Sequence, residues 1–404
     1  MRPDVLEDIA GVCSSLAAEG YFIRFRGFSA IDMYLGLPLL PYHQAETNAD
    51  LATLARFAEE LRFPGVEIAD GAVDTSVGVC YFHCLDGEEE KENHFPFPLL
   101  SFGYNWQSRR FQDPLGVYHL LRSLLQKSPR EFRKDWVDLK EVSLKAIRSS
   151  IDWRSLVMEG ALLLSRYDLC DSAGFIQVLG NCPSGPLPGP EIQKTFLSCL
   201  LISPWPDRGL DLLKRSGLLG QLWPELDSLD DVDHSKEFHP EGNVWNHTLE
   251  TFRYRKAGNS GVFDLRLSLG LLLHDIGKPI AASFGHNRFD GHAELGARAA
   301  ARFLERLEFN SSLVQDIYFL VKNHMLPAAL KRLPFARTGE IMASQLFPTL
   351  MELYRCDESS SFKGLDGYYE NSAAYQTYLR NIKNPYRSAD GKKINKSAIL
   401  HGRI

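Results

Sequence analysis

The stretch LLLHDIGKP, residues 271–279, decides how this chain is interpreted, because it is an apolar helix that ends in a His-Asp pair. Residues 265–273 are almost entirely apolar, and Gly277 with Pro279 is a stop signal for a helix. A titratable pair at the end of a buried helix is costly unless its charge is compensated, and a divalent metal is a common compensation. The stretch therefore predicts a metal site within a helical part of the chain.

Other residues of the same chemistry follow along the chain. Seven of the twelve histidines fall between His234 and His324. Adjacent positions on a helix diverge by about 100°, so His274 can bind one metal while Asp275 points to a neighbouring position and bridges two. The other candidate ligands are His247, His292, His324 and Asp357. They lie on or just outside helices predicted over residues 245–253, 294–307 and 313–323 and an apolar run over 347–354. A core or surface position is the alternative for any single histidine.

The ordered set of six residues resembles the HD-domain metal phosphohydrolases, whose ligands arrive in the order His, His-Asp, His, His, Asp. Imidazole and carboxylate ligands suit one or two ions of Mn²⁺, Fe²⁺, Ni²⁺, Co²⁺ or Zn²⁺. Such a pair of ions activates a water and holds a phosphoryl group. On this basis we expect Asp275 and Lys278 to take part in catalysis. Lys278, His286 and Arg288 are candidates to hold a substrate phosphate, with a solvated loop as the alternative.

Composition restricts the class of protein. At 404 residues the chain is too long for one core and predicts two to four domains. It has neither an evident signal peptide nor a stretch of about 20 apolar residues, and seven scattered cysteines favour a reduced cytoplasm. A net charge of −6 argues against a strongly basic nucleic-acid binder. A local basic face remains open at the C-terminal end, which carries Arg387, Lys392, Lys393, Lys396 and Arg403.

The order of the patterns predicts an α+β protein, with a small mixed α/β head followed by a long all-α body. Residues 21–25 and 77–84 alternate like strands, residues 49–61 form an amphipathic helical pattern, and strand signals nearly vanish from about residue 136. The clearest linker is the Pro/Gly-rich segment 181–190. We expect four regions: a nucleotidyltransferase-like head over 1–135, a helical neck over 136–228, an HD domain over 229–365 and a basic tail over 366–404.

A more specific resemblance rests on five segments: residues 191–229, FHPEGNVWNHTLE (238–250), HDIGKP (274–279), GHAELGA (291–297) and LVKNHM (320–325). Together they resemble the tRNA nucleotidyltransferase/poly(A) polymerase family, whose bacterial CCA-adding members often carry a C-terminal HD domain. The resemblance extends from about Gly20 to Asp357. It implies a nucleotidyltransferase fold for the head, a nucleotide or an RNA 3′ end as substrate, and HD-domain hydrolysis of 2′,3′-cyclic phosphates or nucleotides.

The head departs from that family where its catalytic residues are expected. The family has a Gly-Gly turn, of which this chain keeps only the second glycine, Gly27, because Arg26 replaces the first. Of the family's Arg-Asp pair, only Asp32 is present. Tyr42 and Gln44 stand in place of the two carboxylates that bind Mg²⁺. Asn105 persists from a third motif whose Arg and Asp are missing. Because nucleotidyl transfer needs paired carboxylates to hold the metals, these changes predict a head without nucleotidyltransferase activity and make Mg²⁺ doubtful there.

Three functions follow from these observations. The leading expectation is a cytoplasmic metal-dependent phosphohydrolase that acts on a nucleotide or RNA phosphoester through the HD site, with no membrane partner. The first alternative is a CCA-adding or poly(A) polymerase-type nucleotidyltransferase in RNA processing. The second alternative is a non-catalytic RNA-binding relative of these enzymes.

Overall fold

The computed structural model describes residues 7–58, 60–64, 69–75, 78–85, 97–125, 153–167, 185–233, 242–258, 261–284, 289–361 and 364–394. The chain divides into two compact units. The N-terminal unit comprises Met1–Pro186, Thr195–Leu218 and Ala257–Phe263, and the C-terminal unit comprises Leu187–Lys194, Leu219–Lys256 and Asp264–Ile404. The predicted division into four regions stays a prediction.

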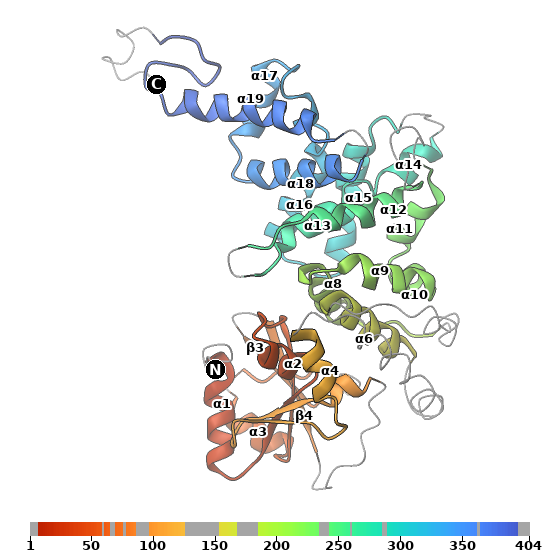
Figure 1. Cartoon of the computed structure of the whole chain (residues 1–404), viewed down its shortest axis with the longest axis vertical. Coiled ribbons are helices and arrows are strands. Elements are labelled where there is room, and N and C mark those ends of the chain that lie inside the picture. The colour runs from red at the N-terminus through yellow and green to blue at the C-terminus, as the bar shows by residue number, and fades with distance from the viewer. Residues whose placement is uncertain are drawn as a thin grey trace. The chain divides into compact units, whose positions relative to one another are not determined.

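The N-terminal unit is built on one mixed sheet (Figure 1). Its strands are β1 (Ile23–Arg26), β2 (Tyr42–Thr47), β3 (Gly71–Thr75), β4 (Gly78–Cys84), β5 (Gly103–Asn105) and β6 (Arg110–Gln112). They are ordered β3-β4-β2-β1-β5-β6, and every neighbouring pair is antiparallel except β2 with β4. The two strands predicted from the sequence correspond to β1 and β4.

Fully buried side chains on one face of the sheet hold these strands together. Phe25 is paired with Ala45, and Ala45 with Phe82, across three adjacent strands. His43 shares that face, because it is two residues from Ala45, and its ring nitrogen Nδ1 lies 3.0 Å from the hydroxyl of Ser29 in the covering helix α2 (Phe28–Leu35). The other helices of this unit are α1 (Glu7–Ala18), α3 (Leu51–Phe57), α4 (Tyr118–Leu125), α6 (Trp153–Arg166) and α9 (Pro206–Arg215).

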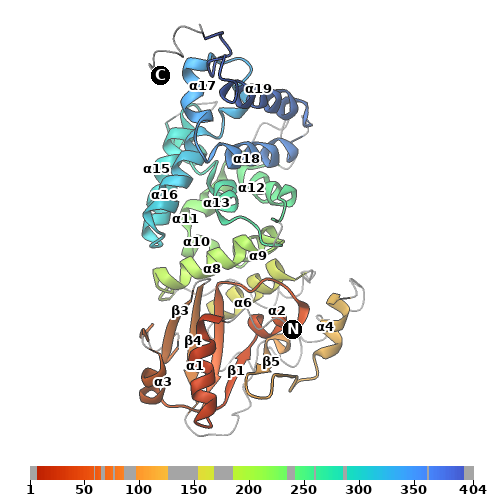
Figure 2. The ribbon, with the colours of Figure 1, turned by 90° about the vertical axis from the view of Figure 1, so that its left-hand side faces the viewer.

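All regular elements that the structure describes in the C-terminal unit are helical. They are α10 (Leu218–Leu222), α11 (Pro224–Asp227), α12 (Val244–Thr251), α13 (Leu265–Leu273), α14 (Lys278–Ser283), α15 (His292–Arg306), α16 (Ser311–Asn323), α17 (Phe335–Met342), α18 (Phe347–Ser359), α19 (Asp366–Ile382) and short 3₁₀ turns. Helix α8 (Pro190–Ile202) contributes to both units. In Figure 2, α15 and α16 run side by side.

Helix α13 is the core element of the C-terminal unit. Its residues from Leu267 to Leu273 are all buried, as expected of a helix that is apolar all round. It packs against α12, α16 and α18. Gly270 permits the close approach of two of these helices, because a Cβ there would lie 2.9 Å from Leu353 Cδ1 and 3.3 Å from Leu320 Cδ1.

The observed helices follow the sequence patterns, but the helix predicted over residues 49–61 is shorter, because α3 comprises only Leu51–Phe57. The helical pattern over residues 207–222 is divided between two helices, because α9 ends before Gly217 and α10 begins after it. Gly217 has φ of 74°, a left-handed conformation that ends an α-helix and that glycine adopts without strain. Residues 86–92, which are rich in acidic side chains, and the first four residues of the linker, 181–184, lie outside the described residues.

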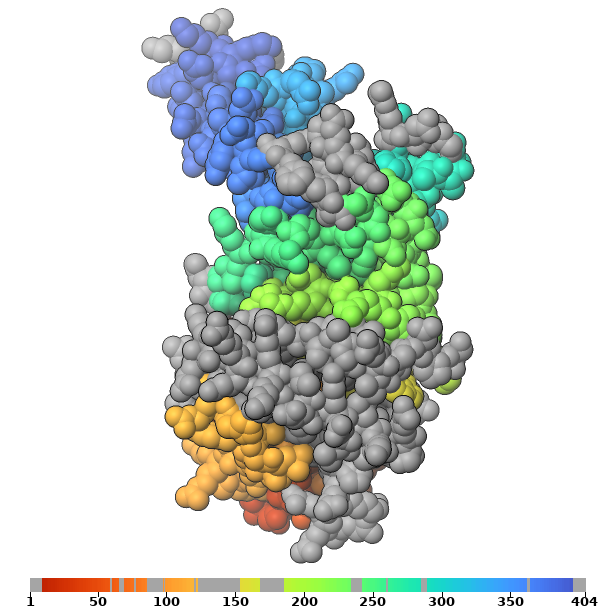
Figure 3. All heavy atoms as spheres, turned by 45° about the vertical axis from the view of Figure 1, so that its right-hand side comes forward, coloured from red at the N-terminus to blue at the C-terminus, as the bar shows by residue number. Residues whose placement is uncertain are grey.

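Part of the surface of the N-terminal unit is formed by the segment from β5 to α4, drawn in orange in Figure 3. Leu115 is 54% exposed there and Tyr118 is 47% exposed. Asp113 begins α4, because its carboxylate accepts hydrogen bonds from the backbone N–H groups of Val117 and Tyr118. No helix in the described part of the chain is long and apolar enough to span a membrane.

The turn after the His-Asp pair crosses α15 at very short range. A Cβ on Gly277 would lie 2.0 Å from the carbonyl oxygen of His292 and 2.5 Å from the backbone nitrogen of Gly296. Both neighbours are backbone atoms, so neither can move aside as a side chain would. The absence of a side chain at Gly277 therefore allows Asp275 and His292 to come together.

We predict that Gly277→Ala destabilises the C-terminal unit by about 3 kcal/mol, the upper part of the range for overpacking a buried position. The measurement is the urea midpoint of the purified variant. Gly189→Ala is the matched control, because a Cβ there meets nothing within 4 Å. Equal midpoints for the two variants would contradict the close crossing.

Candidate metal centre and the altered head

The two side chains at the expected metal positions of the head contact each other. Gln44 Nε2 donates a hydrogen bond to the hydroxyl of Tyr42, whose ring packs 5.6 Å from that of Tyr81. Burial raises the pKa of Tyr42, so the phenol stays neutral at physiological pH. Among the described residues, groups of three or more potential metal ligands occur only in the C-terminal unit. The head therefore offers no cluster of anions in the described residues to hold two cations.

The carboxylates that remain nearby are engaged in buried ion pairs. Glu46 Oε2 accepts from Arg24 Nη2 at 2.7 Å and from Arg26 Nε at 2.6 Å. Asp32 is fully buried, and its two oxygens accept from Arg166 of α6 at 3.2 Å each and from the Tyr167 hydroxyl at 3.0 Å. A displaced pair formed by Asp32 and Glu46 would have to break these contacts to bind a metal.

Arg166 is the main counter-charge for Asp32. Burial raises the pKa of Asp32 to about 6, although the guanidinium acts in the opposite direction. Replacing Arg166 by Met leaves the carboxylate buried without that partner, and breaking such a pair costs about 3–5 kcal/mol. We predict this loss in the stability of the N-terminal unit, measured by chemical unfolding at pH 7.

The loss in Arg166→Met should depend on pH. With a folded-state pKa above the unfolded value, Asp32 binds its proton more tightly in the folded state, so stability falls as pH rises through that window. The deficit should be larger at pH 8 than at pH 5. Adding Asp32→Asn should restore part of the stability, because it removes the unpaired charge. A deficit that does not change with pH would contradict this role for Asp32.

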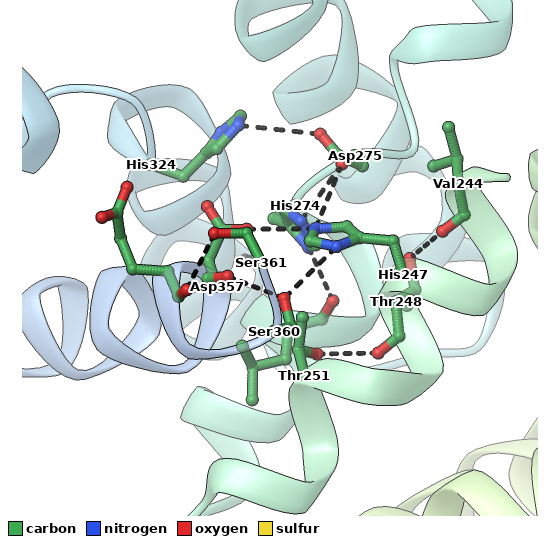
Figure 4. A network of polar contacts seen from close by, with 12 residues as sticks. Val244, His247, Thr248, Thr251, His274, Asp275, His324, Asp357, Ser360 and Ser361 are labelled. Carbon is green, nitrogen blue, oxygen red and sulfur yellow. Dashed lines mark hydrogen bonds and ion pairs between the residues drawn. The ribbon is translucent and has the colours of Figure 1, made fainter. Parts of the chain in front are cut away.

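In the C-terminal unit the six predicted ligands come from five segments that converge. His247 lies within α12, and His274 and Asp275 directly follow α13. His292 begins α15, His324 follows α16, and Asp357 lies in the last turn of α18. Figure 4 shows five of them pointing toward one another, with Asp275 between His324 and the pair His247 and His274.

Asp275 divides the ligands into two groups, one for each carboxylate oxygen. Its Oδ2 lies 3.2 Å from His274 Nε2 and 4.0 Å from His247 Nε2. Its Oδ1 lies 3.6 Å from His292 Nε2 and 3.8 Å from His324 Nε2. Each group has the spacing of a metal site. Asp357 joins the first group through His247, at 3.0 Å from Nε2 to Oδ1.

Backbone carbonyls orient three of the four rings. The Nδ1 atoms of His274, His292 and His324 lie 2.8, 2.8 and 2.7 Å from the carbonyl oxygens three residues earlier, which belong to Leu271, Phe289 and Val321. A carbonyl oxygen only accepts, so each Nδ1 carries the proton and each Nε2 of a neutral ring presents a lone pair. Metal-binding histidines are typically oriented by such a second hydrogen bond.

These lone pairs face one another or a carboxylate, which is unfavourable unless a cation lies between them. His292 Nε2 and His324 Nε2 are 3.1 Å apart. Burial lowers the pKa of both rings, that of His324 to about 4, so both are neutral at pH 7. His274 Nε2 is buried and has no hydrogen-bond partner, because its approach to Asp275 lacks the alignment of a hydrogen bond. Such an orphaned nitrogen is rare in a protein interior and fits a metal ligand.

The remaining predicted site residues have different outcomes. Lys278 Nζ donates to Asp275 Oδ2 at 2.6 Å, and this ammonium lowers the pKa of Asp275, although burial acts in the opposite direction. Lys278 is therefore next to the centre. His286 and Arg288, predicted to hold phosphate, lie outside the described residues.

We predict that Asp275→Ala abolishes bound transition metal, because it removes the carboxylate that the two groups share. His292→Ala should lower the stoichiometry by about one ion. Elemental analysis of the purified variants gives the stoichiometry, and circular dichroism checks that each is folded. An unchanged metal content in Asp275→Ala would contradict the assignment.

Comparison with known proteins gives one family-model match, the HD domain, over residues 244–354. A CC-adding tRNA nucleotidyltransferase from Thermus thermophilus is 36% identical over 178 residues, which are 42% of this chain and 39% of that protein. An A-adding tRNA nucleotidyltransferase from Deinococcus radiodurans is 31% identical over 263 residues, 63% of this chain and 56% of that protein. The chain thus spans less than two thirds of these relatives.

A solved structure has a similar fold. The Bacillus stearothermophilus CCA-adding enzyme in complex with CTP matches with a TM-score of 0.52 and 14% sequence identity, over 94% of this chain and 84% of that one. The sheet-containing head and the helical body expected from the sequence are therefore confirmed as the fold of this chain.

These comparisons correct the leading functional expectation. A metal-dependent phosphohydrolase was expected from the HD residues, but the curated relatives are tRNA nucleotidyltransferases and multifunctional CCA proteins. The HD domain was identified correctly, whereas hydrolysis as the function of the whole chain is wrong. A complete HD ligand set indicates which ions can be bound, whereas the similarity to the tRNA nucleotidyltransferases extends beyond the HD domain.

Proposed function

We propose that this chain is a member of the tRNA nucleotidyltransferase/poly(A) polymerase family that carries an HD domain, and that it acts in RNA processing by binding the 3′-terminal region of tRNA. We further propose that its head recognises RNA or nucleotide without transferring nucleotides. The observation that carries this second point is the hydrogen-bonded pair Tyr42 and Gln44 at the positions of the metal-binding carboxylates.

The reason is one of charge. Two divalent ions and a triphosphate need anionic ligands to be held in line. Tyr42 and Gln44 are neutral, and Asp32 and Glu46 are engaged with three arginines. Breaking either ion pair to release a carboxylate would leave buried charge without its partner, at a cost of several kcal/mol. We therefore expect RNA recognition to be kept while nucleotidyl transfer is lost.

A local basic surface supports RNA as the partner despite the overall charge of −6. Residues 383–394 carry four basic side chains and one acidic side chain, which is a net charge of +3. All four are exposed, and Arg387 pairs with Lys393 in a short β-bridge that closes the turn. Tyr386 is 57% exposed between them and offers a face for a base. Phosphate contacts with stacking at one place suit single-stranded RNA.

We propose that the HD centre holds one or two divalent transition ions, with Mn²⁺, Fe²⁺, Ni²⁺, Co²⁺ and Zn²⁺ as candidates. The donor set of imidazoles and carboxylates without thiolate supports this group of metals. A cytoplasmic location stays a prediction; Cys13, Cys80, Cys199 and Cys356 are buried free thiols, in keeping with a reducing compartment.

We predict that the purified chain binds tRNA but does not incorporate labelled CTP or ATP into tRNA that lacks its 3′ terminus, even with excess Mg²⁺ or Mn²⁺. Binding is measured by fluorescence titration at several salt concentrations. Replacing Lys383, Arg387 and Lys393 together by Gln should weaken binding and reduce the slope of log affinity against log salt by about 0.7–0.9 for each phosphate that the variant no longer neutralises.

The control variant replaces Lys331, Arg298 and Arg306 by Gln, which removes the same charge from exposed positions outside the turn. Equal weakening in both triple variants would mean that only net charge matters. Absence of tRNA binding would refute the proposed function. Incorporation that disappears on Glu46→Ala would instead make the head a working nucleotidyltransferase with a displaced carboxylate.

A further inference from the structure

We propose that Ser360 is a positioning residue of the metal centre, and that its hydroxyl selects the tautomer in which His247 turns a bare Nε2 toward the metal. The inference rests on the metal-ligand assignment of His247 and goes beyond the proposed RNA function, on which it does not depend. Figure 4 shows Ser360 beside the His247 ring, on the same helix end as Asp357.

His247 differs from the other three histidines in how its ring is held. In each of those three rings, Nδ1 lies next to the backbone carbonyl oxygen of the residue three positions earlier. The corresponding carbonyl for His247 belongs to Val244, and it accepts from the hydroxyl of Thr248 at 2.8 Å. His247 Nδ1 instead lies 3.3 Å from Ser360 Oγ, a side chain on the other side of the centre. The orientation of this ring thus depends on a contact between two helices.

The contacts of Ser360 determine which atom carries the proton. Its Oγ lies 2.7 Å from the carbonyl oxygen of Asp357, which only accepts. The single hydroxyl proton of Ser360 is therefore donated to that carbonyl. What Ser360 presents to His247 is a lone pair, and the favourable partner for it is an N–H group. This contact therefore favours the tautomer with the proton on His247 Nδ1 and a bare Nε2.

The other tautomer would compete with metal binding. His247 Nε2 lies 3.0 Å from Asp357 Oδ1. With a proton on Nε2, the ring would donate to this carboxylate and form a closed pair, in which neither residue offers its inward lone pair to a metal. Ser360 counteracts this arrangement, because the Nε2–H tautomer would place a bare Nδ1 against the lone pairs of the hydroxyl. Removing the hydroxyl removes that opposition and favours the closed pair.

The effect should be confined to one half of the centre. Asp357 and Ser360 both come from the end of α18, and they meet His247 of α12. His292 and His324 come from α15 and α16 and have their own carbonyl contacts. The ion held by His247, His274, Asp275 and Asp357 should therefore bind less tightly without Ser360, while the ion held by His292 and His324 is little affected.

The test titrates the metal-free full-length chain with Co²⁺ alone and follows binding by calorimetry and by the visible absorption of the ion. Ser360→Ala should weaken one class of site by about 10-fold, the lower end of the range for second-shell substitutions. Ser360→Thr keeps the hydroxyl and should bind like the wild type. Ser361→Ala is the matched control, because Ser361 makes the same kind of contact, 2.9 Å from the carbonyl oxygen of Glu358, one residue further along.

A second measurement reads the tautomer directly in the metal-free protein. Two-bond ¹H–¹⁵N correlation spectra distinguish the two neutral forms of each imidazole, and His247→Gln assigns the signal. In the metal-free wild type we expect both forms of His247, because Ser360 favours Nδ1–H and the Asp357 carboxylate favours Nε2–H, and we expect a shift toward Nε2–H in Ser360→Ala. Unchanged Co²⁺ affinity in Ser360→Ala, an equal weakening in Ser361→Ala, or the same tautomer populations in the wild type and Ser360→Ala would each overturn the proposal. If the wild type bound no Co²⁺, the ligand assignment would fail and the proposal with it.

Discussion

The C-terminal unit depends on one buried carboxylate that faces four imidazoles. Asp275 is 2% exposed, and its two oxygens point to different pairs of histidines. This polar cluster lies within a helical core, where charge without a partner is expensive. Three surrounding features stabilise the cluster. Backbone carbonyls orient the rings, Gly277 allows α15 to approach, and the ammonium of Lys278 lies beside the carboxylate. Bound cations would complete this balance of charge.

The head meets the same constraint in a different way. Its carboxylates also lie among buried groups, but their counter-charges are arginines of the chain itself. Ion pairs of this kind are satisfied without any ligand, so they stabilise one arrangement of the strands and of α6. The same physical requirement, that buried charge be compensated, thus leads to a site suited to metals in one unit and to internal ion pairs in the other. These internal ion pairs are the physical basis for the proposal that the head does not transfer nucleotides.

The C-terminal unit also shows how ligands on separate helices become interdependent. Three histidines are oriented by carbonyls within their own turn, a local arrangement that survives changes elsewhere. The fourth is held by a residue of a different helix. The affinity of His247 for a metal therefore depends on how α12 and α18 pack together. A centre built in this way has one half that is preorganised locally and one half that is preorganised by tertiary packing.

The sequence by itself determined the helix that ends at His274, and it predicted the order of the six candidate ligands and the presence of Tyr42 and Gln44 where the family has paired carboxylates. These are properties of residue type and spacing, which periodicity and a known motif reveal. It misled on function, because a complete ligand set says what can be bound and not which reaction the chain carries out.

Only the tertiary structure decided that Asp32 is paired with Arg166, 134 residues away, that Gly277 crosses α15, and that Ser360 faces His247 across 113 residues. No local pattern predicts these contacts. Ser360 stands in a run of serines, and nothing in that run distinguishes it from Ser361. Their roles come from contacts between elements far apart in the chain, and the packing of those elements fixes which side chains meet.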